Sequence, residues 1–217
     1  MRLNLQYFGG RGSSGGKRSG GGGSGLSKEE TEMLNSPEVW QAWREDPSLY
    51  QALADPNRRE DMIDEMYDDG WSAESIAEQI EMADFFKKAS ETQTVAGVNT
   101  LYRGERPASM AEAQAKYRVG AEITTTQITS YSSDKSIAES YGHYYGGNRP
   151  AVVIKNTNTS GNFVGTKTIT NGKSLTAEEV LAPKGMTSKV VATRLDTKTN
   201  TLYVTMENSA KPRRRKK

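Results

Sequence analysis

Cysteine is absent from this sequence of 217 residues, and histidine occurs only once, as His143. The absence of cysteine excludes a disulfide-stapled scaffold and any metal site that depends on thiolates. A single histidine excludes zinc sites with several imidazole ligands and disfavours a catalytic pair of serine or cysteine with histidine. We therefore expect no metal in the protein, and we expect His143 at the end of a helix.

Long apolar runs are also missing. No stretch approaches the roughly 18 apolar residues that a membrane-spanning helix requires. The opening Met1–Phe8 is apolar and strand-like, but it is too short for a signal peptide and lacks a small-residue cleavage pattern. The sequence predicts neither a signal peptide nor a membrane contact.

The formal net charge of +2 conceals four unlike regions. Ten of the 21 glycines lie in residues 1–25 with four cations and no acid, whereas residues 29–92 hold 18 acids against 5 cations. Residues 93–210 are mildly basic, and the last seven residues carry six cations. We expect a flexible segment (1–27), an acidic helical subdomain (28–92), a core (93–208) and a basic tail (209–217).

Residues 36–90 carry the signals of helices. Three helices are expected where a capping residue precedes proline: at Ser36-Pro37, at Asp46-Pro47 and at Asp55-Pro56. Asp69-Gly70 should end the third, and Ser72 should cap a fourth. In that helix Ile76, Ile80 and Ala83 fall on one face, while the acids lie mostly off it. We interpret these acids as a solvated helix surface.

After Val95 the pattern changes to short strands and turns. Strands are expected at 98–103, 123–132, 151–155, 162–168, 179–181, 188–194 and 202–206, and short helices at 109–117 and 134–144. Helices first and antiparallel strands later are typical of an α+β protein.

Three segments of the C-terminal half could carry chemistry. They are Leu101–Gly104 at the end of a strand, Ser130–Ser132 at the end of the next, and Ala177–Leu181, where two acids open a buried strand. Each alone is a weak signal, because such tripeptides and acidic pairs are common on protein surfaces.

In this order and spacing, the three segments resemble the Arg–Ser–Glu class of mono-ADP-ribosyltransferases over roughly residues 93–208. The run I-T-S-Y-S-S-D-K-S-I-A-E-S-Y is similar to the strand, S-T-S motif, turn and helix of that class, and E-V-L-A-P-K-G-M-T-S-K-V-V is similar to its catalytic strand, turn and following strand. The resemblance implies an N-terminal helical subdomain packed on a mostly antiparallel β core, with NAD as co-substrate.

The resemblance also implies a role for each candidate residue. Cleavage of the bond between nicotinamide and ribose builds positive charge on the ribose, which the Glu179 carboxylate would stabilise. Ser130 would orient that glutamate, and Arg103 would pair with the pyrophosphate through its planar, charged fork. Ser132 would support the strand, and Gly104, Ser130 and Ser132 would join Arg103 in binding NAD. Tyr102, Tyr131 and Tyr141 are candidates for an aromatic wall against the nicotinamide.

The sequence departs from the family at the acceptor side. Ala177 stands where arginine-modifying members have a second glutamate, so neighbouring Glu178 would have to take that part. The preceding loop, Thr170–Thr176, lacks the aromatic residue that the family often uses against its target. Tyr131 replaces the threonine of S-T-S, and Ile128 replaces the usual aromatic residue. A divergent transferase, an NAD glycohydrolase and an inactive scaffold all fit these departures.

The two ends of the chain suggest an origin and a partner. Met1–Gly12 resembles the openings of minor head and morphogenesis proteins of phages of Gram-positive bacteria, some of which carry ADP-ribosyltransferase domains. This implies a phage-encoded transferase, located in the virion or the host cytoplasm, that acts on a host protein and contacts other virion proteins. The tail Lys211–Lys217 can bind DNA nonspecifically through its phosphates, or it is simply solvated. The alternative hypothesis is a virion structural or DNA-associated protein with a degenerate transferase fold.

Overall fold

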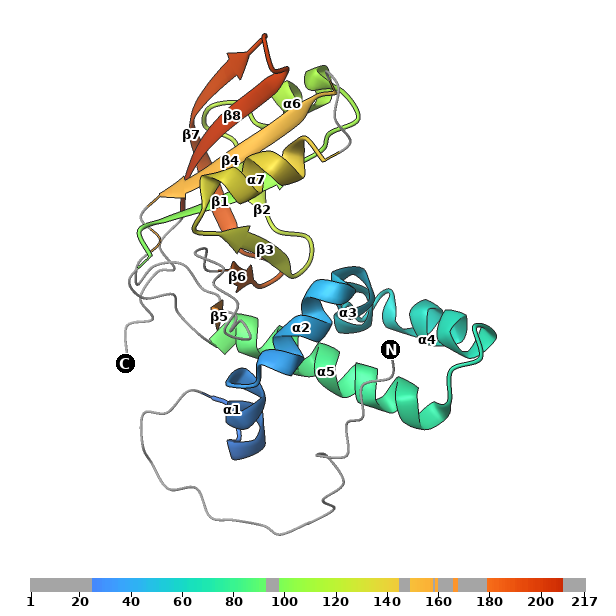
Figure 1. The fold of residues 1–217 in the computed structure, drawn as a ribbon. Helices are drawn as coiled ribbons and strands as arrows, with labels where there is room; N and C mark the ends of the chain where they lie inside the picture. The colour runs from blue at the N-terminus through green and yellow to red at the C-terminus, as the bar shows by residue number, and fades with distance from the viewer. Residues whose placement is uncertain are drawn as a thin grey trace, which may run out of the picture.

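The computed structural model describes residues 25–92, 98–144, 149–157, 159, 166–167 and 179–208. Five helices come first in the chain: α1 (Lys28–Leu34), α2 (Pro37–Glu45), α3 (Pro47–Ala54), α4 (Arg59–Asp68) and α5 (Ala73–Thr92). A sheet follows, flanked by α6 (Met110–Lys116) and α7 (Lys135–Gly142). Figure 1 shows the five helices grouped below the sheet, with β5 and β6 nearest to them.

Local capping chemistry starts most of the helices. Ser27 forms a capping box with Glu30 at α1, and the side chains of Ser36 and Asp46 accept hydrogen bonds from the first turns of α2 and α3. Ser72 Oγ accepts from the Ser75 amide at the start of α5, as the sequence predicts.

The predicted helix start at Asp55-Pro56 is wrong. Helix α4 begins only at Arg59, and Asp55 instead ends α3. Its carboxylate accepts hydrogen bonds from the Asn57 amide and, at 3.0 Å, from Lys184 beyond β6. Asp55 therefore closes a turn and ties it to the sheet, so its side chain is not available to cap α4.

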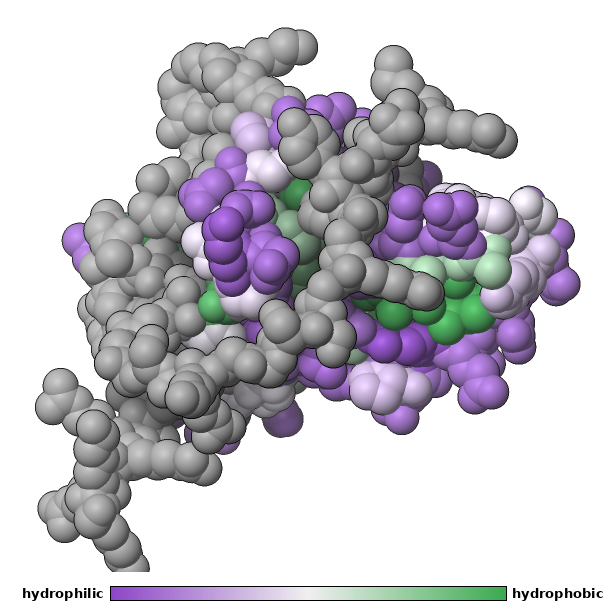
Figure 2. All heavy atoms as spheres, turned by 90° about the horizontal axis from the view of Figure 1, so that it is seen from below, coloured by the Kyte–Doolittle hydropathy of each residue, from purple (hydrophilic) through white to green (hydrophobic). Residues whose placement is uncertain are grey.

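Aromatic side chains form the core of the helical block. Trp40, Trp43, Tyr50, Phe85 and Phe86 are buried and in ring contact, and Ile128 and Leu181 from the sheet join the same cluster. None of the acids of residues 29–92 is buried, and most are exposed. Figure 2 shows this underside as mainly hydrophilic around a smaller hydrophobic area, in line with a solvated acidic surface.

The described strands form one mostly antiparallel sheet. They are β1 (Thr100–Glu105), β2 (Glu122–Thr124), β3 (Thr129–Ser132), β4 (Ala151–Thr157), β5 (Thr166–Lys167), β6 (Glu179–Ala182), β7 (Thr187–Asp196) and β8 (Thr201–Asn208). Their order is β2-β7-β8-β4-β1-β3-β6-β5, and only the β4–β8 pair is parallel. The α+β class is confirmed, while the boundaries at 27, 92 and 208 stay predictions.

The predicted strand 123–132 is two strands. β2 ends at Thr124 and pairs with β7, whereas β3 begins at Thr129 and lies between β1 and β6. Between them Thr125 turns the chain, because its hydroxyl donates to the Pro183 carbonyl at 2.6 Å and its amide donates to the Met186 carbonyl at 2.9 Å. Of the predicted strand 162–168, only β5 lies within the described residues.

Candidate active site

Arg103, Ser130 and Glu179 lie on three neighbouring strands in the sheet. β1 carries Arg103, β3 carries Ser130, and β6 opens with Glu179. The register pairs Tyr102 with Ser132, and Ser132 with Glu179. Residues far apart in the chain are thus brought to adjacent strands.

Strand alternation decides which side chains share a face. Ser132 and Glu179 are directly opposite, so they lie on one face, and Ser130 lies two residues along on that face. Ser130 is therefore a diagonal neighbour of Glu179, at a separation within reach of a long side chain such as that of Glu179. Arg103 directly follows Tyr102 in β1, so its side chain leaves the strand on the face opposite to that of Tyr102 and Ser132.

Helix α2 reaches both members of the Ser130–Glu179 pair. Arg44 Nε lies 3.0 Å from Glu179 Oε2, and the two side chains are 27% and 24% exposed. Trp43 Nε1 donates to Ser130 Oγ at 3.3 Å. Trp43 and Arg44 are not predicted as site residues from the sequence. The helical spacing of Val39 and Trp43 signals the burial of Trp43, but no pattern signals its partner.

Arg103 is held by two contacts. Its Nη1 donates to the Ser130 carbonyl at 3.0 Å, and its Nε donates to Glu105 at 3.3 Å. Glu105 also accepts from the Tyr117 hydroxyl at 2.6 Å and from Lys116 at 3.0 Å. Burial raises the pKa of the Glu105 carboxyl, but Arg103, Tyr117 and Lys116 outweigh it and bring that pKa below its ordinary value.

The aromatic candidates occupy different environments. Tyr131 is buried in a cluster on the other face from Ser130, where burial raises the pKa of its hydroxyl to about 12. Tyr141 is exposed on α7 and lies 4.4 Å beneath the Arg106 guanidinium. Tyr102 is half-buried and pairs in register with Ser132, so it is the candidate nearest to the Ser130–Glu179 face.

Ser132 and Gly104 have structural partners. Ser132 Oγ accepts from the Asp134 amide at 3.0 Å, which joins β3 to the start of α7. α7 packs so closely on β1 that a Cβ at Gly104 would lie 2.1 Å from the Ala138 carbonyl oxygen. His143 ends α7, as predicted, and its Nε2 is 3.0 Å from Thr201 Oγ1.

Other features that the sequence singles out lie outside the described residues. They are Ala177 and Glu178, the loop 170–176, the opening 1–12 and the tail 211–217. Within the described ranges, no three histidine or acidic residues are grouped so that they could hold a metal ion. The helices that the structure describes include none with the length and apolarity to cross a membrane.

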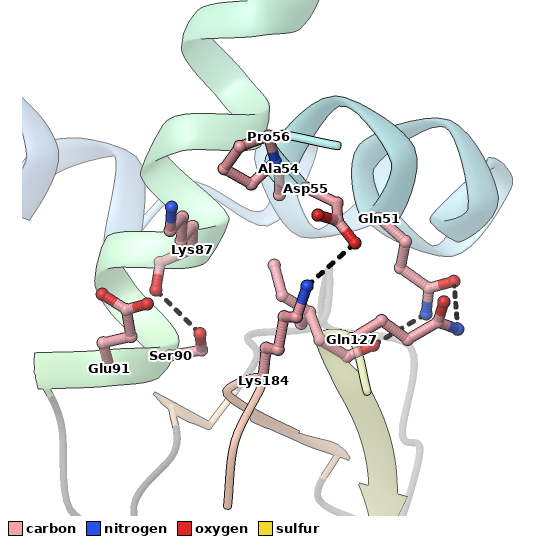
Figure 3. Close-up of a pocket in the computed structure, with 10 residues that line it drawn as sticks. Gln51, Ala54, Asp55, Pro56, Lys87, Ser90, Glu91, Gln127 and Lys184 are labelled. Atoms are coloured by element: carbon pink, nitrogen blue, oxygen red, sulfur yellow. Dashed lines mark hydrogen bonds and ion pairs between the residues drawn. The ribbon is translucent and has the colours of Figure 1, made fainter. Parts of the chain in front are cut away.

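A polar seam joins the helical block to the sheet. Gln51 Nε2 donates to the Ile128 carbonyl at 2.8 Å, and Gln127 donates to Gln51 at 2.9 Å. The Lys184–Asp55 ion pair lies beside them across a pocket of about 180 Å³ (Figure 3). These contacts fix the helical block against β3 and the turn after β6, which keeps α2 over the candidate residues.

Comparison with known proteins shows the fold. No protein-family model and no curated protein matches the sequence. Among solved structures, the Vis toxin, an ADP-ribosyltransferase from Vibrio splendidus, is 15% identical with a TM-score of 0.53, over 86% of this chain and 75% of that one.

Two clostridial structures are also similar to this chain. An ADP-ribosyltransferase from Clostridium botulinum is 17% identical with a TM-score of 0.50, over 85% of this chain and 88% of that one. The C3 exoenzyme of Clostridium limosum is 16% identical with a TM-score of 0.50, over 86% of this chain and 87% of that one. The chain therefore has the ADP-ribosyltransferase fold.

Proposed function

We propose that this protein is a phage-encoded mono-ADP-ribosyltransferase that cleaves NAD and transfers ADP-ribose to a protein of its bacterial host. The observation that carries the proposal is the position of Arg103, Ser130 and Glu179 on the adjacent strands β1, β3 and β6 of a sheet with this fold. The order and residue types match those that the sequence resemblance implies.

The three side chains supply the groups that NAD cleavage needs. A carboxylate such as Glu179 stabilises the positive charge that develops on a ribose as its bond to nicotinamide breaks. The Ser130 hydroxyl orients the carboxylate from the same face of the sheet. The Arg103 guanidinium takes the pyrophosphate. A guanidinium has more N–H groups than the two Arg103 contacts use, so pyrophosphate binding does not require displacement of Glu105.

Tyr102 is the aromatic side chain best suited to face the nicotinamide. It pairs in register with Ser132 and is half-buried, whereas Tyr131 is only 5% exposed and has little surface to offer a ligand. Ala177 lacks the carboxylate of arginine-modifying enzymes, so we propose an acceptor other than arginine, with Glu178 as the acid next to it.

The resemblance of Met1–Gly12 to phage proteins supports the phage origin and the location in virion or host.

Hydrolysis of etheno-NAD and transfer of labelled ADP-ribose to proteins of a bacterial lysate test the proposal. The wild-type chain is expected to give both signals, and Glu179→Ala is expected to reduce them by about 100-fold or more. Mass spectrometry of the labelled lysate then identifies the acceptor. Equal signals from the wild type and Glu179→Ala would refute the assignment.

The second candidate function is a virion structural or DNA-associated role with an inactive transferase fold. Two observations favour it: Ala177 in place of a glutamate, and basic sequences at both ends. It predicts no thermal shift at millimolar NAD, whereas a ligand at about 100 times its Kd stabilises a protein by about 2.7 kcal/mol. It also predicts DNA binding that weakens with salt and with deletion of Lys211–Lys217.

A further inference from the structure

We propose that Trp43 is a positioning residue: its indole N–H fixes the Ser130 hydroxyl so that this hydroxyl donates to the Glu179 carboxylate. The inference rests on the proposed function, because it assigns a role in aligning the carboxylate that would stabilise the ribose. Trp43 itself has no contact with substrate in this role and acts through Ser130.

The position of the Trp43 N–H is rigid. The side chain is only 1% exposed, and its ring packs edge-on against Phe86 at 5.2 Å and lies at 6.3 Å from Tyr50. Phe86 is fully buried and also contacts Trp40. A ring enclosed in this way keeps one orientation, so its N–H marks a fixed point above β3.

Hydrogen-bond chemistry then decides where the Ser130 proton points. An indole nitrogen can only donate, so Trp43 occupies an acceptor lone pair of Ser130 Oγ. The single hydroxyl proton must point to a different acceptor. An ionised carboxylate only accepts, and that of Glu179 lies diagonally across from Ser130 on the same face. In the proposed arrangement the Trp43 contact leaves the Ser130 proton to donate to Glu179, the carboxylate on its own face of the sheet.

Arg44 does not compete for this proton. A guanidinium has no acceptor, and its Nε donates to Oε2 of Glu179. The Glu179 carboxylate thus accepts a hydrogen bond from Arg44 on α2, and in the proposed arrangement it accepts a second one from Ser130 on β3. The Arg44 contact is a partly exposed ion pair, whereas the Trp43 donor belongs to a side chain of the buried aromatic cluster.

Removal of the single N–H group tests the inference. Trp43→Phe keeps an aromatic ring and loses the donor, so kcat for NAD hydrolysis should fall about five- to tenfold while KM for NAD changes less than about twofold. Trp40→Phe is the matched control, because Trp40 is fully buried in the same cluster but donates to the Leu34 carbonyl at 2.9 Å. It should leave kcat unchanged.

A double-mutant cycle isolates the pathway through Ser130. In a Ser130→Ala background, Trp43→Phe should cause no further loss of kcat, because the group that Trp43 positions is gone. If Trp43→Phe folds poorly, benzothienylalanine at position 43 gives the same test, since it keeps the bicyclic shape and lacks the N–H.

The outcomes separate this inference from the proposed function. Wild-type turnover no faster than that of Glu179→Gln would overturn the enzymatic function and the positioning role together. Wild-type turnover with equal kcat values for the Trp43 and Trp40 variants would overturn the positioning role alone. Equal losses from Trp43→Phe with and without Ser130 would also overturn it.

Discussion

Arg44 on α2 donates to the Glu179 carboxylate on β6 at 3.0 Å, across 135 residues of sequence. The contact joins the helical block to the residue proposed to stabilise the ribose. Both side chains are about one-quarter exposed, so solvent screens the ion pair and its contribution is modest. The positive charge of Arg44 at this distance also partly cancels the negative charge of Glu179, which is the charge that would stabilise a developing ribose cation.

The first prediction concerns Arg44→Gln. Because the ribose of NAD and the guanidinium would compete for the same carboxylate, opening the ion pair costs binding energy, about 1 kcal/mol for a partly exposed pair. The variant should therefore bind NAD about two- to fivefold more tightly, as measured by calorimetry.

Arg58→Gln provides the control for charge alone. Arg58 is exposed before α4, so its removal changes the charge of the helical block by the same amount away from Glu179. NAD affinity should be unchanged in this variant. Weaker NAD binding by Arg44→Gln would instead mean that Arg44 contacts NAD directly.

The second prediction is an acid-dependent loss of stability through Glu105. The pKa of this carboxyl is held below its ordinary value by Arg103, Tyr117 and Lys116, against the effect of burial. A lowered pKa stabilises the fold above the unfolded value, and the contribution is lost as pH falls through the folded value. Glu105→Gln should lower Tm at pH 7, and its deficit relative to the wild type should shrink between about pH 5 and pH 3.

Thermal unfolding followed across this pH range measures the effect. Glu112→Gln serves as a control, because Glu112 is exposed on the neighbouring helix α6. Its Tm difference from the wild type should stay constant or nearly so. A Glu105→Gln deficit that does not change with pH would show that the carboxyl contributes no proton linkage.

Capping signals within a few residues made the starts of α2 and α3 predictable from sequence. A contact distant in sequence helps to explain why the predicted helix start at Asp55-Pro56 is wrong. Ser36 and Asp46 cap α2 and α3 because each side chain bonds an amide three residues away. Asp55 carries the same sequence signal, but its carboxylate accepts from the Asn57 amide and from Lys184, which lies 129 residues away. A pattern within a few residues cannot contain that information.

The residues of the candidate site likewise fall into those with a local sequence signal and those defined by contacts distant in sequence. Arg103, Ser130 and Glu179 could be proposed from sequence because each has a recognisable neighbourhood within one strand. Trp43 could not be assigned, because its partner lies 87 residues away and becomes adjacent only when the helical block packs on β3. Its burial was predictable from helical spacing, but its use of the N–H group was not.

The last prediction concerns the fit of α7 on β1 at Gly104. A Cβ there would lie 2.1 Å from the Ala138 carbonyl oxygen and 2.8 Å from the Gly142 amide nitrogen. Both are backbone atoms, so no side-chain rotation relieves the clash and α7 must move. Gly104→Ala should destabilise the protein by about 3 kcal/mol, which lowers Tm by about 6–12 °C in a chain of this size.

Gly142→Ala is the matched control within the same interface. Its Cβ would meet the Ala151 methyl group at 3.3 Å, a side-chain contact that small adjustments relieve. The Tm loss should therefore be much smaller than for Gly104→Ala. Because Ser132 ties the start of α7 to β3, the displaced helix should also perturb the strand that carries Ser130, and NAD turnover should fall with stability. Equal Tm values for the two variants would show that α7 packs on β1 with room for a methyl group.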